Sequence, residues 1–315
     1  MAFTVHETIR CFGGNLLKLS HESSSTSCRM SLNLYLPPQA IRKDGKKVPV
    51  LMYLSGLTCT ADNCSEKGFF QHRASQRGIA MLYPDTSGLG IAGEDDAIDL
   101  GTGASYYVDA TREPWSAGYK MYTYLTEELP EKLFGFFDEL DGSRVSVTGL
   151  CVGGHGALTL FLKNPGKYQS CSAFAPVANP INCPWGKKAF TAYFGEKDVE
   201  KWKENDATEL VKKWKGPLDL LIDIVSTIAM TGTNLALAKV QQGTADHFAD
   251  EGQLLVDNFM EAAQKAGVAK GIRLRRQPGY NHSYYFMSTF ADEHVDYAAD
   301  ALLGLSSTPS DGGAV

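Results

Sequence analysis

A cysteine occupies the centre of the glycine-flanked segment Gly149-Leu-Cys151-Val-Gly153, which directly follows the apolar run 144–148. The order Gly-x-nucleophile-x-Gly between a strand and a helix is typical of a nucleophile elbow, in which glycines allow a sharp turn and the central side chain lies above the sheet. The N-terminus of the following helix favours negative charge that develops during attack. Serine is usual at this position, and a buried core thiol is the alternative interpretation. The segment predicts Cys151 as a nucleophile if a base and an acid follow it.

Four histidines follow the cysteine and could act as its base. His155 lies on the helix just after the elbow and is expected to point away from it. His247 comes too early in the chain, and His294 lies in the helical stretch 289–301, where a surface position is expected. His282 lies in a loop after the last predicted strand, which is where the base of an α/β-hydrolase is found. The topology therefore predicts His282 as the base.

The orienting acid should precede the base and follow a strand, because the chain order in this fold is nucleophile, acid, histidine. Asp246 lies in the turn Gly243-Thr-Ala-Asp246 and follows the apolar run 218–222. Asp223 lies nearer to the end of that run and is the competing candidate. We expect Asp246 to be the acid.

An acyl-transfer site also needs two N–H donors for the oxyanion of the tetrahedral intermediate. One donor is expected from Val152, directly after the nucleophile, and the other from the loop after an earlier strand. The loop 55–59 follows such a strand, and Gly56 would let the backbone of Leu57 turn toward the substrate. No metal-ligand set and no phosphate-binding loop is visible in the sequence.

Short apolar runs alternate with helical patterns along the chain, which favours a mostly parallel sheet with helices on both faces. The predicted strands are 30–37, 48–54, 79–83, 144–148, 218–222 and 272–275, and the predicted helices are 65–77, 121–137, 154–163, 254–265 and 289–301. The sequence thus predicts the α/β class and an α/β-hydrolase fold. Ligands of such sheets bind beyond the carboxyl ends of the strands, where the candidate residues lie.

Composition restricts the class of protein further. The chain has 315 residues, 43% of them hydrophobic, and a net charge of −6, so no basic surface for nucleic acid is expected. Seven cysteines without CxxC spacing, and a start without a charged segment before an apolar run, predict a reduced, cytoplasmic chain without a secretory signal. No apolar window approaches the length of a membrane span. Residues 1–305 are expected to form a single domain, and 306–315 a frayed tail.

These residues together make the chain resemble the S-formylglutathione hydrolase (esterase D) family over nearly its whole length. The segments that carry the resemblance are 54–60, 83–87, 93–96, 101–103, 107–111, 114–115, 119–130, 153–158, 183–190 and 279–285. The resemblance implies hydrolysis of S-formylglutathione to glutathione and formate in formaldehyde detoxification, with simple esters also cleaved. It further implies an enzyme without a cofactor that can form a homodimer.

Carried onto this sequence, the family's nucleophilic serine falls on Cys151, its acid on Asp246, its base on His282 and its active-site cysteine on Cys59. The chain departs from the family's pattern at Cys151, at Val152 where methionine is usual, and at Gly88-Leu89 in place of a Pro-Arg pair. A catalytically impaired relative acting as a binding protein, or a cysteine hydrolase of another ester or lactone, are the alternative functions.

A further departure is an atypical insertion of about eighteen residues, 225–242, between the strand and the acid. Typical connections have about 2–6 residues. Val225-Ser226 can be encoded by GTAAGT, Thr233-Asn234 by a sequence containing CTAAC, and Gln241 or Gln242 by CAG. These are the donor, branch point and acceptor of a short intron. We therefore hypothesise a translated, unspliced intron, with a genuine surface loop as the alternative.

Overall fold

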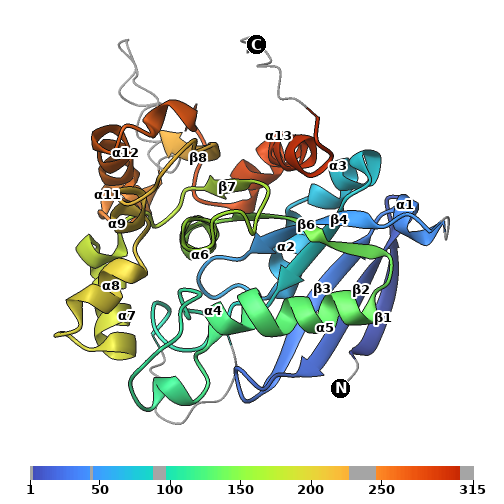
Figure 1. Ribbon diagram of the computed structural model, residues 1–315, viewed down its shortest axis with the longest axis horizontal. Coiled ribbons are helices and arrows are strands. Elements are labelled where there is room, and N and C mark those ends of the chain that lie inside the picture. Colours follow the sequence, from blue (N-terminus) through green and yellow to red (C-terminus); the bar gives the residue numbers. More distant parts are fainter. Residues whose placement is uncertain (1–2, 43–44, 88–96, 227–245, 306–315) are drawn as a thin grey trace, which may run out of the picture.

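The computed structural model describes residues 3–42, 45–87, 97–226 and 246–305. These residues contain a nine-stranded sheet with the order β1-β2-β3-β5-β4-β6-β7-β8-β9 (Figure 1). The strands are β1 (Thr4–Cys11), β2 (Gly14–Glu22), β3 (Arg29–Leu36), β4 (Val48–Leu54), β5 (Ala80–Pro84), β6 (Leu140–Gly149), β7 (Cys171–Phe174), β8 (Leu220–Ser226) and β9 (Ile272–Pro278).

The sheet is parallel from β5 to β9, while β1, β2 and β3 are antiparallel to their neighbours. Every residue of β4 and β5 is buried, as expected for parallel strands with both faces covered. The predicted mostly parallel α/β-hydrolase sheet is confirmed.

Helices cover both faces of this sheet. The helices are α1 (Pro38–Ile41), α2 (Ala61–Lys67), α3 (Phe70–Arg77), α4 (Met121–Thr123), α5 (Leu129–Phe136), α6 (Val152–Lys163), α7 (Pro184–Phe194), α8 (Val199–Glu204), α9 (Ala207–Val211), α11 (His247–Asp250), α12 (Val256–Lys265) and α13 (Tyr284–Leu302). A π-helical turn, Tyr124–Glu128, joins α4 to α5, and short 3-10 turns cover Trp115–Ala117, Pro180–Asn182 and Ala269–Gly271. On one face α13 packs against α2 and α3, and on the other α6 packs against β4, β6 and β7 (Figure 1).

Two predicted helices are interrupted. The helix predicted over 65–77 is divided between α2 and α3 at Gly68, where a Cβ atom would lie 2.6 Å from Cys64 Sγ, and Phe69 has a left-handed φ of 59°. The helix predicted over 121–137 contains the π-helical turn before α5. Strands β1, β2 and β7 were not predicted.

The predicted insertion begins inside a strand. Val225 and Ser226 pair with Gln277 and Pro278 of β9, so β8 continues four residues past the predicted end at residue 222. The first two residues of the predicted insertion therefore belong to β8, and the bounds of the insertion relative to the family stay a prediction. The rest of the insertion, the 306–315 tail and the Gly88-Leu89 departure lie outside the described residues.

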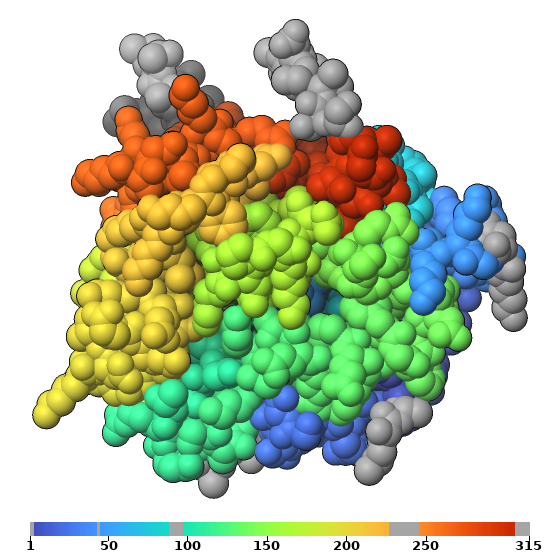
Figure 2. All heavy atoms as spheres, viewed as in Figure 1, coloured from blue at the N-terminus to red at the C-terminus, as the bar shows by residue number. Residues whose placement is uncertain are grey.

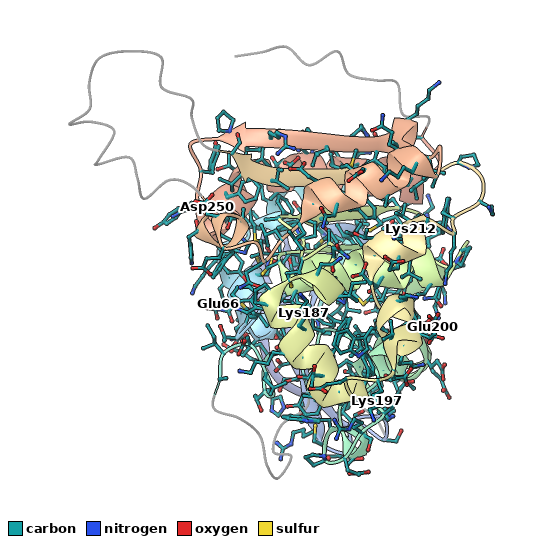
Figure 3. All side chains as sticks on the ribbon, turned by 90° about the vertical axis from the view of Figure 1, so that its left-hand side faces the viewer. Glu66, Lys187, Lys197, Glu200, Lys212 and Asp250 are labelled. Carbon is teal, nitrogen blue, oxygen red and sulfur yellow. The ribbon has the colours of Figure 1, made fainter. Side chains whose placement is uncertain are left out.

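On the face shown in Figure 2, α5, α6 and the α7–α9 region make up much of the surface. Seen from the side of α7 and α8, Lys187, Lys197 and Lys212 share the surface with Glu200 and Asp250, so charges of both signs lie on it (Figure 3). In the described ranges, no helix combines the length and the apolar character needed to cross a membrane.

Candidate active site

The elbow that carries Cys151 joins β6 to α6. Cys151 has φ 57° and ψ −116°, a positive-φ conformation that non-glycine residues rarely adopt. Gly153 permits this turn because a Cβ atom there would lie 2.0 Å from the Leu54 carbonyl oxygen at the end of β4. The Cys151 N–H donates to the Phe174 carbonyl of β7 at 2.9 Å. The thiol is thereby held at the carboxyl ends of β4, β6 and β7, where the elbow pattern predicts it.

Asp246 is the N-cap of α11. Its Oδ1 accepts hydrogen bonds from the N–H groups of Phe248 at 3.1 Å and Ala249 at 3.3 Å. An aspartate at this position satisfies N–H groups that have no partner within the helix. The cap fixes the carboxylate and leaves Oδ2 available for another donor.

His282 supplies that donor from the loop between β9 and α13. Its Nδ1 lies 2.7 Å from Asp246 Oδ2, and the two side chains are 6% and 1% exposed. The Phe248 ring meets the imidazole edge to face, with centroids 4.9 Å apart and an interplanar angle of 89°. The bond to Asp246 holds Nδ1 as the donor and leaves Nε2 to serve as base.

The imidazole is held in a strongly charged environment. Burial would lower the pKa of His282, but the charge of Cys151, the hydrogen bonds to Asp246 and Cys151, and the charge of Asp246 outweigh it and raise that pKa to about 10. An imidazole with a raised pKa keeps the proton that a neighbouring thiol gives up. His282 therefore holds a proton readily at this position.

The competing acid, Asp223, contacts a different set of side chains. It is fully buried and accepts two hydrogen bonds from Arg275, at 2.6 and 2.7 Å, and one from Gln277 at 3.3 Å. His294 Nε2 lies 3.5 Å from its Oδ2. Both oxygens of Asp223 are thus engaged by β9 and α13, and the carboxylate that contacts His282 is Asp246.

The expected surface position of His294 is wrong. Its side chain is fully buried, Nδ1 is 2.9 Å from Ser172 Oγ, and the ring stacks on Phe174 with centroids 3.7 Å apart. The physical reason is that α13 lies against β7 and β8, and His294 faces the sheet.

A cavity of about 220 Å³ lies in front of the candidate nucleophile. It is lined by Gly56, Leu57, Thr58, Cys59, Ile98, Leu150, Cys151, Trp185, Phe248, His282, Ser283 and Tyr284. The sequence predicted Leu57, Cys59, Cys151 and His282 among these. Most of the remaining wall is apolar or aromatic, so the cavity is suited to a small acyl group with few polar atoms.

The two residues predicted to supply the oxyanion donors both lie near the elbow. Val152 is the first residue of α6, and Leu57 lines the cavity beside Gly56. A Cβ atom on Gly56 would lie 3.3 Å from Cys151 Cβ, which shows how closely this loop approaches the elbow. Within the described chain, neither the Leu57 nor the Val152 N–H has a hydrogen-bond acceptor, so both are available to an oxyanion.

Cys59 is the second thiol of the cavity. The Tyr284 hydroxyl lies 3.8 Å from its Sγ. Burial raises the pKa of Cys59, and the hydrogen bond from Tyr284 only partly opposes this effect. Cys59 is therefore held mainly as a neutral thiol. In the described ranges, no group of three or more His, Cys, Asp or Glu side chains is arranged to hold a metal ion.

Comparison with known proteins places this architecture in a family. Residues 23–297 match the family model Esterase, described as "Putative esterase". The chain is 47% identical over 296 residues to an S-formylglutathione hydrolase of Rattus norvegicus, with 93% of this chain and 96% of the relative covered. It is 42% identical to an S-formylglutathione hydrolase of Arabidopsis thaliana, with 93% and 95% covered. This chain belongs to the S-formylglutathione hydrolase family.

The fold agrees with this assignment. The solved structure of an S-formylglutathione hydrolase from Agrobacterium tumefaciens aligns with a TM-score of 0.83 and 38% identity, covering 96% of this chain and 100% of that one. A ferulic acid esterase, 16% identical, aligns over 91% of this chain with a TM-score of 0.65 and shares the fold. Within a family that is usually serine-based, the cysteine at position 151 is the departure that bears on chemistry.

Proposed function

We propose that this chain hydrolyses S-formylglutathione to glutathione and formate, with Cys151 as nucleophile, His282 as base and Asp246 as the orienting acid. The observation that carries the proposal is the 2.7 Å contact between His282 Nδ1 and Asp246 Oδ2, in a cavity that Cys151 also lines. The names of the relatives support the choice of substrate.

Acylation begins when His282 holds the proton of Cys151 and the thiolate attacks the formyl carbonyl. The negative charge that develops on the carbonyl oxygen is stabilised by the N–H groups of Leu57 and Val152. Collapse of the tetrahedral intermediate breaks the bond to the glutathione sulfur, which takes the proton from His282 Nε2 and leaves as a thiol, so that the imidazole is neutral again. Asp246 stabilises the imidazolium and keeps Nε2 directed at the thiol.

Deacylation uses the same groups in reverse. Neutral His282 takes a proton from water, the hydroxide attacks the formyl carbon, and the Cys151 thiolate leaves with formate as product. The cysteine differs from serine in the intermediate, which is a thioester instead of an oxygen ester. An oxyanion site shaped for serine must also accept the longer C–S bond.

The test is the release of glutathione and formate from S-formylglutathione by purified protein, with a p-nitrophenyl ester as a second substrate. We expect Cys151→Ala to abolish the hydrolysis and Cys151→Ser to retain or increase it, since serine restores an oxygen nucleophile in the same turn. Cys11→Ser, on β1, is the matched control and should behave like the parent chain.

An Ala variant as active as the parent chain would show that Cys151 is not the nucleophile. Hydrolysis of the p-nitrophenyl ester without any cleavage of S-formylglutathione would instead favour a hydrolase of another ester. A parent chain that cleaves neither compound would be the impaired relative.

A further inference from the structure

The intermediate on Cys151 would have the same type of bond as its substrate. In the step GS–CHO + Cys151–S⁻ → Cys151–S–CHO + GS⁻, one thioester is consumed and one is formed, and a thiolate replaces a thiolate. Acylation is therefore close to balanced in free energy, and the formyl group stays activated on the enzyme. A serine would form a more stable oxygen ester, from which return to a thioester is uphill.

We propose that the chain is also a formyltransferase, which passes the formyl group from Cys151 to a small thiol in competition with water. This inference rests on the proposed function. The second step is Cys151–S–CHO + R–S⁻ → Cys151–S⁻ + R–S–CHO, in which the new C–S bond forms as the bond to Cys151 breaks. No oxidant, reductant or further reactant is needed.

His282, the base of the site, discriminates between the two acceptors of the formyl group, a thiol and water. The departing GS⁻ takes the proton of His282, so that, once Cys151 is acylated, the imidazole is neutral and keeps the contact to Asp246 at 2.7 Å. A neutral imidazole removes a proton from a thiol, whose pKa is about 8.5, far more readily than from water, whose pKa is about 15.7. The thiolate that results is also a stronger nucleophile toward a thioester than water is.

The walls of the cavity favour the same outcome. An ordered water needs two to four polar partners. The cavity is lined by Leu57, Leu150, Trp185 and Phe248 besides the hydroxyl-bearing Thr58, Ser283 and Tyr284, and none of its described lining residues is a carboxylate. Among the described lining residues, His282 is accordingly the side chain suited to activate water. An acceptor thiol, in contrast, can occupy the position that the departing glutathione sulfur has just left.

Cys59, the second thiol of the cavity, does not accept the formyl group in place of a thiol from solution. Burial holds Cys59 mainly in its neutral form, and Tyr284 hydrogen-bonds its sulfur. The thiolate is the nucleophilic form of cysteine, so a thiol kept neutral is a weak acceptor. The acceptor is therefore a thiol from solution, and glutathione itself fits because its sulfur already leaves by this route.

The experiment incubates the purified chain with S-formylglutathione and isotopically labelled glutathione in millimolar excess. Mass spectrometry measures labelled S-formylglutathione, and formate is measured in the same samples. Cys151→Ala gives the rate of uncatalysed exchange, which is subtracted, and Cys11→Ser is the matched cysteine control. We expect enzyme-dependent exchange to exceed formate release by about tenfold or more. In Cys151→Ser the ratio of exchange to hydrolysis should fall at least about tenfold, because the intermediate becomes an oxygen ester.

The outcomes separate this inference from the proposed function. Formate release without exchange above the Ala background would overturn the formyltransferase and leave the hydrolase intact. Exchange without formate release would support the formyltransferase and overturn the hydrolase. An exchange-to-hydrolysis ratio that is the same in Cys151→Ser as in the parent chain would also overturn the inference, because the thioester intermediate would then have no influence.

Discussion

Replacing Asp246 by asparagine would remove one charge from the site and almost no volume. In the parent chain Oδ1 accepts two N–H groups at the start of α11, and Oδ2 accepts the His282 proton. An asparagine has one oxygen. If that oxygen keeps the helix cap, its NH₂ group faces His282 Nδ1, which must then become an acceptor. The other tautomer results, with the proton on Nε2, and the ring can no longer act as base toward Cys151.

The expected loss follows from these contacts. Losing a hydrogen bond to a charged partner costs about 1.5–3 kcal/mol, which corresponds to about 10- to 150-fold in kcat. The wrong tautomer adds to this, and the same change in a serine-protease triad lowers kcat by about 10⁴. We therefore expect Asp246→Asn to lower kcat for S-formylglutathione by about 10² to 10⁴ with little change in KM.

Asp223→Asn is the matched control, because it makes the same chemical change in the same part of the fold. Asp223 is fully buried and paired with Arg275, which is 32% exposed and also contacts Glu293. Breaking a buried ion pair costs about 3–5 kcal/mol, and the exposure of Arg275 places this change near the lower value. We expect a lower thermal unfolding midpoint but a near-parental kcat for the folded fraction. A severe loss of kcat in Asp223→Asn beside a mild one in Asp246→Asn would refute the assignment of the acid.

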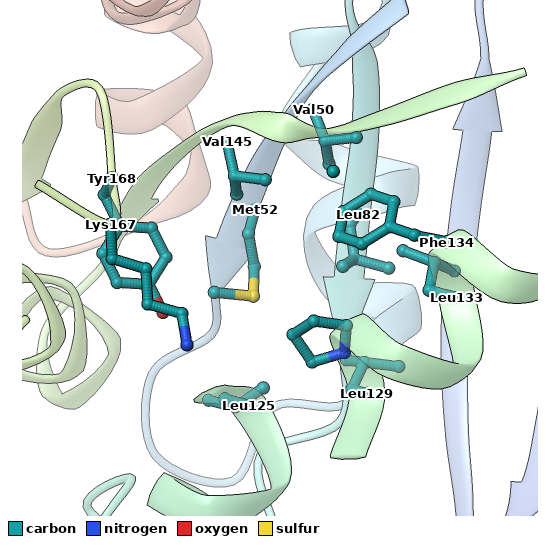
Figure 4. A pocket seen from close by; sticks show the side chains of 12 residues that line it. Val50, Met52, Leu82, Leu125, Leu129, Leu133, Phe134, Val145, Lys167 and Tyr168 are labelled. Atoms are coloured by element: carbon teal, nitrogen blue, oxygen red, sulfur yellow. The ribbon is translucent and has the colours of Figure 1, made fainter. Parts of the chain in front are cut away.

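Three other predictions concern stability and the insertion. Burial would raise the pKa of Glu128, but hydrogen bonds from Lys132, Ser25 and Ser24 outweigh it and hold that pKa below its usual value. Its contribution to stability is thus present above the unfolded pKa of about 4.5 and lost on acidification, and Glu128→Gln should narrow the difference in unfolding midpoint between pH 7 and pH 3. Leu129→Ala would enlarge a remote apolar cavity of about 50 Å³ between α5 and the sheet (Figure 4). It should cost about 2–5 kcal/mol in chemical denaturation, against less than about 1.5 kcal/mol for the control Leu129→Met, with kcat unchanged in both. Deleting Val225–Gln242 should give a more soluble and more active chain, and transcripts that all carry these codons would refute the intron hypothesis.

The central strands could be predicted because their sequences admit few alternatives. The prediction of β4 agrees with the structure at both ends, since a continuous apolar run there is bounded by polar and glycine residues. Strand β1 was missed because most of its side chains are exposed, so it has no apolar periodicity. Strand β7 has only four residues, too few for a pattern.

The residues of the site also divide into those that the sequence could predict and those that it could not. Cys151, Asp246 and His282 follow strands in a fixed chain order, so sequence reasoning could propose them together. Trp185 and Phe248 come from α7 and α11, and no periodicity or motif in these segments places them near the thiol. The burial of His294 was also beyond reach, because its neighbours Asp292 and Glu293 are charged and its contacts with Ser172 and Phe174 span more than a hundred residues.

The residues on both sides of the predicted insertion are held in place by hydrogen bonds. The site can therefore form despite the insertion. On its N-terminal side, β8 is paired with β9 through Ser226 and Pro278. On its C-terminal side, Asp246 caps α11 and contacts His282 at 2.7 Å. Neither anchor depends on the length of chain between them, and the entropic cost of a longer loop grows only slowly with length. The acid is thus positioned by its own helix cap and by its histidine, so a long connection between β8 and α11 can be tolerated.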